Sequence, residues 1–206
     1  MTTEGVRTYP VTHSAGNHEV TLRLMTAGDK DAVLAFARTL PEHDLLFLRR
    51  DITQEPVMQD WLSELQSGEV VTILALKASE VVGYATIHRS LLRWTAHVAE
   101  LRVMIAESMR GAGLGRVLTQ EAFATALSEG IEKMVAQMTL DQKGAIATFE
   151  GLGFRPEALL RDQVKDREGN KHDLLVLSDE AYFDVRFQGA SQSIVSRSPS
   201  ASGRGR

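Results

Sequence analysis

Two apolar, β-branched runs lie close together near the middle of the chain, and they constrain the fold more than any other feature. VVTILALK, residues 70–77, and VVGYATIH, residues 81–88, flank the three residues ASE. Two such runs joined by a short turn predict a β-hairpin. A third run of the same character, HVAELRVMIA at 97–106, follows and adds another strand. The chain is therefore expected to contain an antiparallel sheet.

Strand-like and helical patterns alternate on both sides of this hairpin. Val20, Leu22 and Leu24 alternate with polar residues and predict a strand, and 27–40 has helical spacing up to Pro41. The predicted order is strand, helix, one or two short helices around Pro56, the hairpin and its following strand, then helix 114–130, strand 131–140, helix 143–153, and strands 155–166 and 171–179. This order predicts an α/β (α+β) fold with a mixed, mostly antiparallel sheet flanked by helices.

Length and composition indicate one soluble domain with tails. The 206 residues are 43% hydrophobic and 24% charged, as in ordinary globular proteins. We expect a flexible segment over 1–18, the folded domain over 19–188, and a disordered Ser/Arg-rich tail over 189–206. The absence of cysteine excludes disulfides, thiolate metal sites and a cysteine nucleophile, and it fits a reducing cytoplasm.

Charge and hydropathy argue against several classes of partner. The formal net charge of −4 provides no global field that would favour a nucleic acid or an acidic membrane. The N-terminus lacks the apolar region of a signal peptide, and no apolar run approaches the roughly 20 residues that span a bilayer. We expect neither a nucleic-acid nor a membrane partner, no metal, and a cytoplasmic location.

The stretch RGAGLG, Arg110–Gly115, lies between the strand at 97–106 and the helix that begins at 114. The first N–H groups of a helix have no internal partner, and glycines let an anion approach them closely. Arg110 can add a charge-assisted contact. A phosphate-binding P-loop would need Gly-Lys-Ser/Thr, and a dinucleotide fingerprint would place its third glycine one residue later. A plain glycine turn is the remaining alternative.

The chain resembles the GCN5-related N-acetyltransferase (GNAT) family from about Val20 to Ser178. RGAGLG fits the family's Arg/Gln-x-x-Gly-x-Gly/Ala loop, ELRVMIA precedes it, and AIATFEGLGF follows some thirty residues later, in the family order. The resemblance implies the acyl-CoA N-acyltransferase fold, acetyl-CoA as cosubstrate and a primary amine as acceptor, attacked directly in a ternary complex. The alternative is a non-catalytic or slow acyl-CoA-binding module. A homodimer is compatible with either.

The resemblance also implies which residues contact the cofactor. The loop would hold the CoA diphosphate on its backbone N–H groups, and the end of the preceding strand would pair with the pantetheine arm. Gln142 stands where the family has a helix-start asparagine, and Phe149 replaces a tyrosine that protonates the departing thiolate, so water, another side chain or no acid serves here. The implied residues are Met104, Ile105, Arg110, Gly111, Ala112, Gly113, Leu114, Gly115, Gln142 and Phe149.

Glu100 is the candidate catalytic residue. An amine is mostly protonated at neutral pH, so a base must remove a proton before or during attack. Glu100 lies in the strand before the loop, and a glutamate in this strand resembles the base of several family members. Alternatively, Glu100 pairs with Arg102 or Arg93 and only supports the sheet. His88 and His97 are either further base candidates or polar strand ends.

Overall fold

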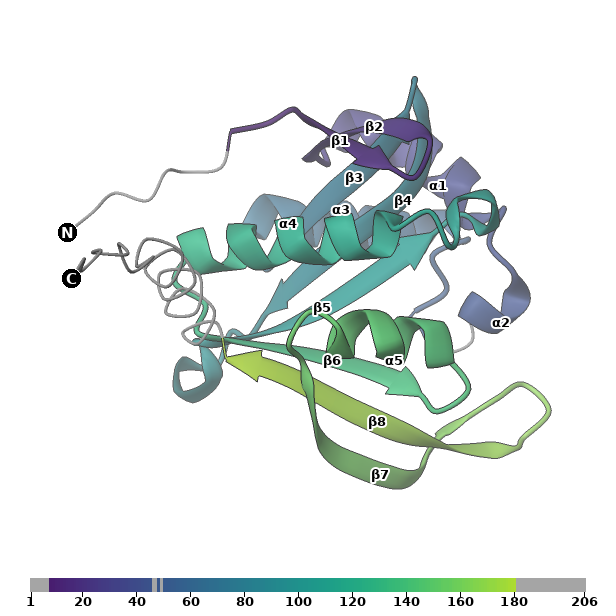
Figure 1. Ribbon diagram of the computed structural model, residues 1–206, viewed down its shortest axis with the longest axis vertical. Helices are drawn as coiled ribbons and strands as arrows, with labels where there is room; N and C mark the ends of the chain where they lie inside the picture. Colours follow the sequence, from purple (N-terminus) through teal and green to yellow (C-terminus); the bar gives the residue numbers. More distant parts are fainter. Residues whose placement is uncertain (1–7, 46–47, 49, 181–206) are drawn as a thin grey trace, which may run out of the picture.

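The computed structural model describes residues 8–45, 48 and 50–180, and its centre is one eight-stranded sheet (Figure 1). The strand order is β1-β2-β3-β4-β5-β6-β8-β7, with β5 and β6 parallel and the other neighbours antiparallel. The predicted mixed, mostly antiparallel sheet is confirmed. The strands are β1 (Val11–Ala15), β2 (His18–Leu24), β3 (Val70–Lys77), β4 (Glu80–Arg89), β5 (Val98–Ile105), β6 (Lys133–Thr139), β7 (Arg155–Lys165) and β8 (Lys171–Glu180).

Helices cover both faces of the sheet. Figure 1 shows α4 and α5 on one face, with α1 and α3 behind the other. The short helices are η1 (Ala27–Asp29), η2 (Arg93–Thr95) and η3 (Glu107–Met109), and the α-helices are α1 (Lys30–Ala37), α2 (Glu42–Leu45), α3 (Glu55–Ser67), α4 (Leu114–Ser128) and α5 (Lys143–Glu150).

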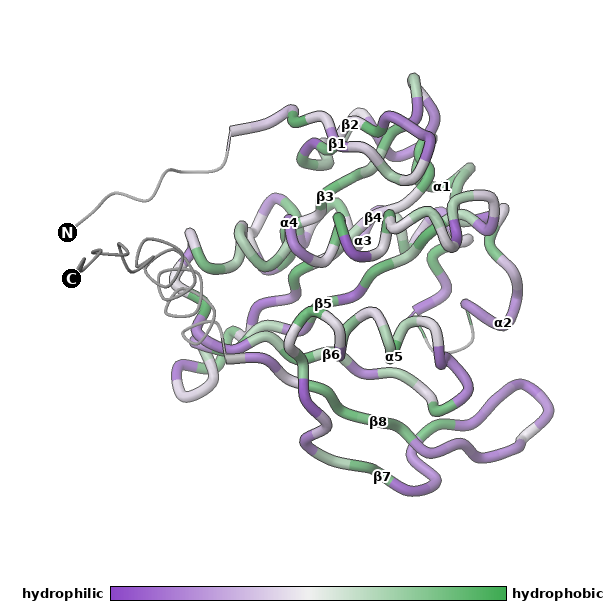
Figure 2. Tube along the Cα trace, viewed as in Figure 1, coloured by the Kyte–Doolittle hydropathy of each residue, from purple (hydrophilic) through white to green (hydrophobic). Residues whose placement is uncertain are grey.

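Each face of the sheet has its own apolar core. The stripe Leu114, Leu118, Ala122 and Ala126 of α4 is at most 1% exposed, because helical spacing points all four side chains at the sheet. This predicted stripe is confirmed. On the opposite face Trp61 of α3 packs its ring 5.2 Å from that of Tyr84 in β4. Figure 2 shows the corresponding hydrophobic colouring along the central strands.

The N-terminal prediction is wrong in part. Residues 11–15 form β1, which pairs antiparallel with β2, although a flexible segment was expected over 1–18. Gly16 has a φ of +58° and supplies, with Asn17, the two-residue turn between the strands. The strand, VTHSA, has three polar residues between its two apolar ones, and only Ala15 in it is fully buried. The tail predicted over 189–206 lies outside the described residues.

The sheet divides between β5 and β6. The two strands pair only at Val98, Ala99 and Glu100, although both strands are described along their full length. Beyond Glu100, β5 stays paired with β4 as far as Ile105. The backbone of β5 from 101 to 105 therefore has an edge that faces away from β4 and pairs with no strand of the described chain.

An ion pair anchors the start of the first helical segment and gives a testable pH dependence. Arg23 donates hydrogen bonds of 2.7 and 2.5 Å to the carboxylate of Asp29, and the N–H of Thr26 donates a third of 2.8 Å. The bonds from Arg23 are the largest cause that lowers the pKa of Asp29 to about 2. Stability from this group is present above the unfolded pKa, near 4, and is lost as pH falls toward 2.

We therefore expect Asp29→Asn to lower the free energy of unfolding by about 2 kcal/mol at neutral pH. The difference from the wild type should shrink as pH falls from about 4 to 2, because the wild-type carboxylate becomes protonated there. Urea denaturation over a pH series measures both quantities. A difference that is independent of pH would show that the charge of Asp29 contributes nothing.

Candidate active site

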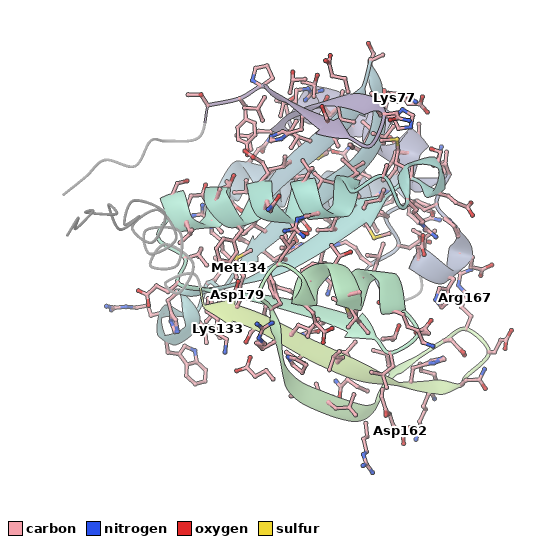
Figure 3. The ribbon with its side chains drawn as sticks, in the orientation of Figure 1. Lys77, Lys133, Met134, Asp162, Arg167 and Asp179 are labelled. Carbon is pink, nitrogen blue, oxygen red and sulfur yellow. The ribbon has the colours of Figure 1, made fainter. Side chains whose placement is uncertain are left out.

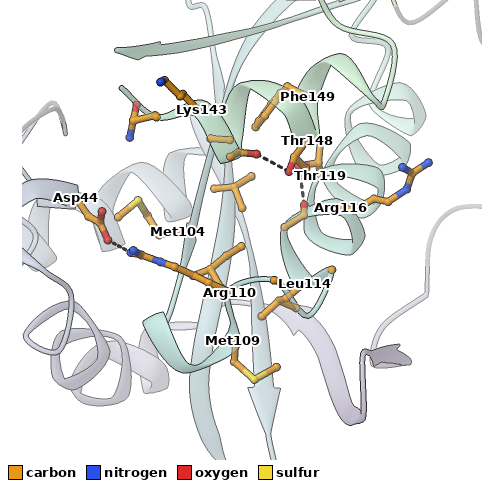
Figure 4. Close-up of a pocket in the computed structure, with 18 of the residues that line it drawn as sticks. Asp44, Met104, Met109, Arg110, Leu114, Arg116, Thr119, Lys143, Thr148 and Phe149 are labelled. Atoms are coloured by element: carbon orange, nitrogen blue, oxygen red, sulfur yellow. Dashed lines mark hydrogen bonds and ion pairs between the residues drawn. The ribbon is translucent and has the colours of Figure 1, made fainter. Parts of the chain in front are cut away.

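A cavity of ≈ 660 Å³ lies where β5 and β6 separate (Figure 4). Its walls come from the end of β5, residues 109–111 and 113–116, the start of α5, and α2. We refer to it as the donor cavity, after the acetyl donor that the sequence resemblance implies. All the predicted cofactor-binding residues except Ala112 line it, namely Met104, Ile105, Arg110, Gly111, Gly113, Leu114, Gly115, Gln142 and Phe149.

The glycine loop, Arg110–Gly115, needs its three glycines for two different reasons. Gly111 and Gly113 have φ angles of +73° and +83°, a left-handed conformation that L side chains rarely adopt. Gly115 has no positive φ, but a Cβ there would lie 3.0 Å from Cδ1 of Ile105, so the bare backbone lets α4 approach β5. A side chain at Gly111 or Gly113 would therefore strain the backbone, and one at Gly115 would require the Ile105 side chain to shift.

Backbone N–H groups remain available in this loop. Arg110, Ala112 and Val117 donate to the carbonyls of Glu107, Met109 and Gly113. Among the described residues, the amides of Gly111 and of 113–116 donate to no backbone carbonyl. They lie at the positive end of α4, where an anion is stabilised by the helix dipole and by direct hydrogen bonds. The walls of the donor cavity therefore fit a diphosphate.

Ala112 lies beside the turn between β1 and β2. A Cβ built on Gly16 in the β1–β2 turn would be 3.4 Å from the methyl carbon of Ala112. The side chain of Ala112 thus faces the N-terminal hairpin, which the sequence did not predict. Its predicted contact with the cofactor stays a prediction that depends on the backbone alone.

Further polar side chains that were missed from the sequence line the donor cavity, among them two cations and two threonines (Figure 4). Arg116 stands near the start of α4 and Lys143 at the start of α5, so each adds a positive charge to a helix N-terminus. The hydroxyls of Thr119 and Thr148 donate 2.8 Å bonds to Gly115 and Gly144 carbonyls. The sequence signal that could have found Arg116 and Lys143 was their position in the first turn of a predicted helix.

Gln142 and Phe149 have structural contacts as well as a place in the donor cavity. The side-chain oxygen of Gln142 accepts a 3.1 Å bond from the N–H of Thr139, which shapes the connection from β6 to α5. Phe149 is buried and packs edge-on against Phe154, with ring centroids 4.9 Å apart. Neither side chain supplies an acidic proton at this place.

Glu100 lies at the point where β5 and β6 separate. It is the last residue of β5 that pairs with β6, and its side chain shares a face of β5 with Arg102 and Met104. Met104 lines the donor cavity. Oε1 of Glu100 is 2.5 Å from Nη2 of Arg102, and the two side chains are 11% and 19% exposed. Of the two arginines considered as partners, Arg102 is the one that the structure places beside Glu100.

A second, smaller hollow of ≈ 40 Å³ adjoins this face of β5. Arg102 and His88 line it together with Arg50, Glu64 and residues of the α3 side. His88 is the register partner of Glu100 on β4, and its Nε2 lies 3.1 Å from the hydroxyl of Thr86. His97 is exposed and precedes β5, outside both hollows.

The described residues form neither a metal cluster nor a membrane-spanning helix. Within the part of the chain that the structure describes, no group of three or more His, Asp or Glu side chains is arranged to hold a metal ion. Its helices are also too short or too polar to cross a bilayer.

Comparison with known proteins decides the family. Residues 28–154 match the model of the acetyltransferase (GNAT) family. The chain belongs to this family. The resemblance inferred from RGAGLG and its flanking segments is therefore confirmed, and the protein is an acyltransferase enzyme of the GNAT type.

Relatives and solved structures agree with this family. The putative phosphinothricin acetyltransferase YwnH of Bacillus subtilis is 26% identical over 163 residues, which cover 78% of this chain and 99% of YwnH. A Salmonella typhimurium putative acetyltransferase, yncA, solved with acetyl-CoA, matches with a TM-score of 0.69 at 20% identity over 80% of this chain and 95% of that one. A Sinorhizobium meliloti phosphinothricin acetyltransferase in complex with AcCoA matches with a TM-score of 0.67 at 21% identity, over 78% and 88%. These two likenesses establish the GNAT fold.

Proposed function

We propose that this GNAT enzyme transfers the acetyl group of acetyl-CoA to a primary amine, by direct attack in a ternary complex. The observation that carries the proposal is the donor cavity at the β5–β6 separation, with free loop amides on one wall. The loop amides and Arg110 would hold the diphosphate, and Met104 and Ile105 would pair their main chain with the pantetheine arm. Two solved relatives contain acetyl-CoA, which supports this choice of donor.

The proposed chemistry assigns one proton to Glu100. The amine nitrogen forms a bond to the thioester carbonyl carbon, the carbon–sulfur bond breaks, and Glu100 accepts the proton that the nitrogen loses. Two observations support this assignment: Glu100 lies where the strands separate, and its side chain shares a face of β5 with Met104. CoA leaves as a thiolate and takes its proton from water, since Phe149 carries no hydroxyl.

The acceptor would approach from the α3 side of the sheet. Glu100, Arg102 and Met104 share that face, and the second hollow opens beside Arg102. A small-molecule amine and a protein lysine or N-terminus are both acceptors of this chemistry. YwnH and the Sinorhizobium meliloti structure are named for phosphinothricin, so this amine belongs in the first set to be tested. A cytoplasmic location and a homodimer stay predictions.

The test is release of free thiol from acetyl-CoA in the presence of phosphinothricin, amino acids, polyamines and a lysine peptide. We expect at least one amine to accelerate thiol release and to carry the acetyl group in the product. The alternative, a slow or non-catalytic acyl-CoA-binding module, predicts acetyl-CoA binding by calorimetry without acceleration by any amine. The absence of a phenol at Phe149 is the feature that favours this alternative.

A further inference from the structure

Helix α2 lies on one side of the donor cavity and makes ion pairs with neighbouring segments. His43 and Asp44 line the cavity, and Figure 4 shows the Asp44 side chain directed at the Arg110 guanidinium. Figure 3 places Arg167, at the turn between β7 and β8, beside α2. Three consecutive residues of α2 thus reach three separate segments, with Glu42 paired with Arg167, Nε2 of His43 2.7 Å from Oδ2 of Asp141, and Asp44 paired with Arg110.

The contact between Asp44 and Arg110 concerns the proposed diphosphate site directly. Arg110 begins the glycine loop and lines the donor cavity, and it is adjacent in sequence to Gly111, whose amide is free. A guanidinium binds a carboxylate and a phosphate through the same fork of N–H donors. The carboxylate of Asp44 therefore occupies, on Arg110, a position that a phosphate oxygen would take.

The other charges that line the donor cavity differ from Asp44 in this respect. Asp141 is paired with His43 rather than with a residue of the glycine loop. Arg116 and Lys143 line the cavity and form no ion pair with a carboxylate among the described residues. Of the two carboxylates that line the cavity, Asp44 is thus the one paired with Arg110, the arginine expected to bind the diphosphate.

We propose that Asp44 is an internal competitor of the donor's diphosphate, and that it sets the affinity of the enzyme for its donor. The inference rests on the proposed function, since it assumes that CoA binds in this cavity. Binding exchanges one anion for another on Arg110. If both stay nearby, two negative charges face one guanidinium and repel each other. In either case the carboxylate of Asp44 weakens binding of phosphate-bearing donors.

The experiment is calorimetric titration of CoA and of pantetheine, which lacks the phosphates, into three proteins. These are the wild type, Asp44→Asn and the control Glu42→Gln, which removes a carboxylate from the same helix outside the cavity lining. Asp44→Asn should bind CoA about threefold or more tightly, whereas Glu42→Gln should match the wild type. Pantetheine affinity should be the same in all three.

Two outcomes would overturn the proposal, and a third would refute the proposed function. Unchanged or weaker CoA binding in Asp44→Asn would overturn the proposal, because Asp44 would then be neutral or would orient Arg110 for the phosphate. An equal gain for pantetheine would also overturn it, since the gain would come from a wider cavity rather than from charge. A wild type that binds no CoA would instead refute the proposed function. Thermal unfolding of each variant verifies that it is folded.

Discussion

Replacing Glu100 with glutamine is expected to lower kcat/KM by roughly 10²-fold or more at neutral pH, while acetyl-CoA affinity stays nearly unchanged. The amide keeps the size of the side chain but cannot accept the proton of the attacking amine. The effect should appear in kcat, because the donor contacts are made by other residues. Steady-state kinetics on one working amine, together with calorimetry of acetyl-CoA, measures both quantities.

The ion pair with Arg102 requires a control for this experiment. Oε1 of Glu100 and Nη2 of Arg102 are 2.5 Å apart and mostly buried, so the variant leaves a guanidinium without its carboxylate and loses some stability. Glu129→Gln is a matched control, because Glu129 pairs with Arg89 at the end of β4 and does not line the donor cavity. Only stability should fall in the control.

The two interpretations of Glu100 predict different patterns. If Glu100 is the general base, Glu100→Gln loses turnover and keeps donor binding. If Glu100 only supports the sheet, the variant loses stability and CoA binding together. Wild-type kcat/KM in a folded Glu100→Gln protein would remove Glu100 from the mechanism. His88, the register partner of Glu100 on β4, would then be the next base to test.

Gly113→Glu is expected to weaken CoA binding at least tenfold, which is about 1.4 kcal/mol. Gly113 precedes α4 with a φ of +83°, and the amides that follow it are free for an anion. A glutamate at this position brings a negative charge to the diphosphate site and strains the backbone. Calorimetric titration of CoA measures the loss.

Gly130→Glu is the matched control, because it introduces the same charge and backbone strain at a distance from the glycine loop. Gly130 follows the other end of α4 with a φ of +80°, and like Gly113 it has no atom within 4 Å of an added Cβ. Both variants should lose a similar amount of stability, but only Gly113→Glu should lose CoA affinity. If the two variants bind CoA equally well, the glycine loop is not the diphosphate site.

The sequence could predict those parts of the fold that rest on local periodicity. The β3–β4 hairpin, the α4 stripe and the strand-loop-helix order around RGAGLG follow from alternation, from helical spacing and from glycine chemistry. The position of Glu100 and Arg102 on one strand face follows from the same period of two. β1 was missed because three polar residues, Thr12 to Ser14, separate its two apolar residues, so the sequence shows no apolar alternation there.

Contacts between distant segments could not be predicted in the same way. Asp44 and Arg110 are 66 residues apart, and neither neighbourhood contains a pattern that pairs them. The contact of the Ala112 side chain with Gly16 could not be predicted either, since the β1–β2 turn was not foreseen. The separation of β5 from β6 depends on where the parallel pairing stops, which side-chain alternation does not encode.

Amide hydrogen exchange with and without acetyl-CoA tests the central claim, that the donor binds at the β5–β6 separation, most directly. The account predicts slower exchange, on adding acetyl-CoA, of the free loop amides at Gly111 and 113–116 and along the unpaired edge of β5 over 101–105. Unchanged exchange in both segments, with acetyl-CoA bound and protection elsewhere in the protein, would contradict it.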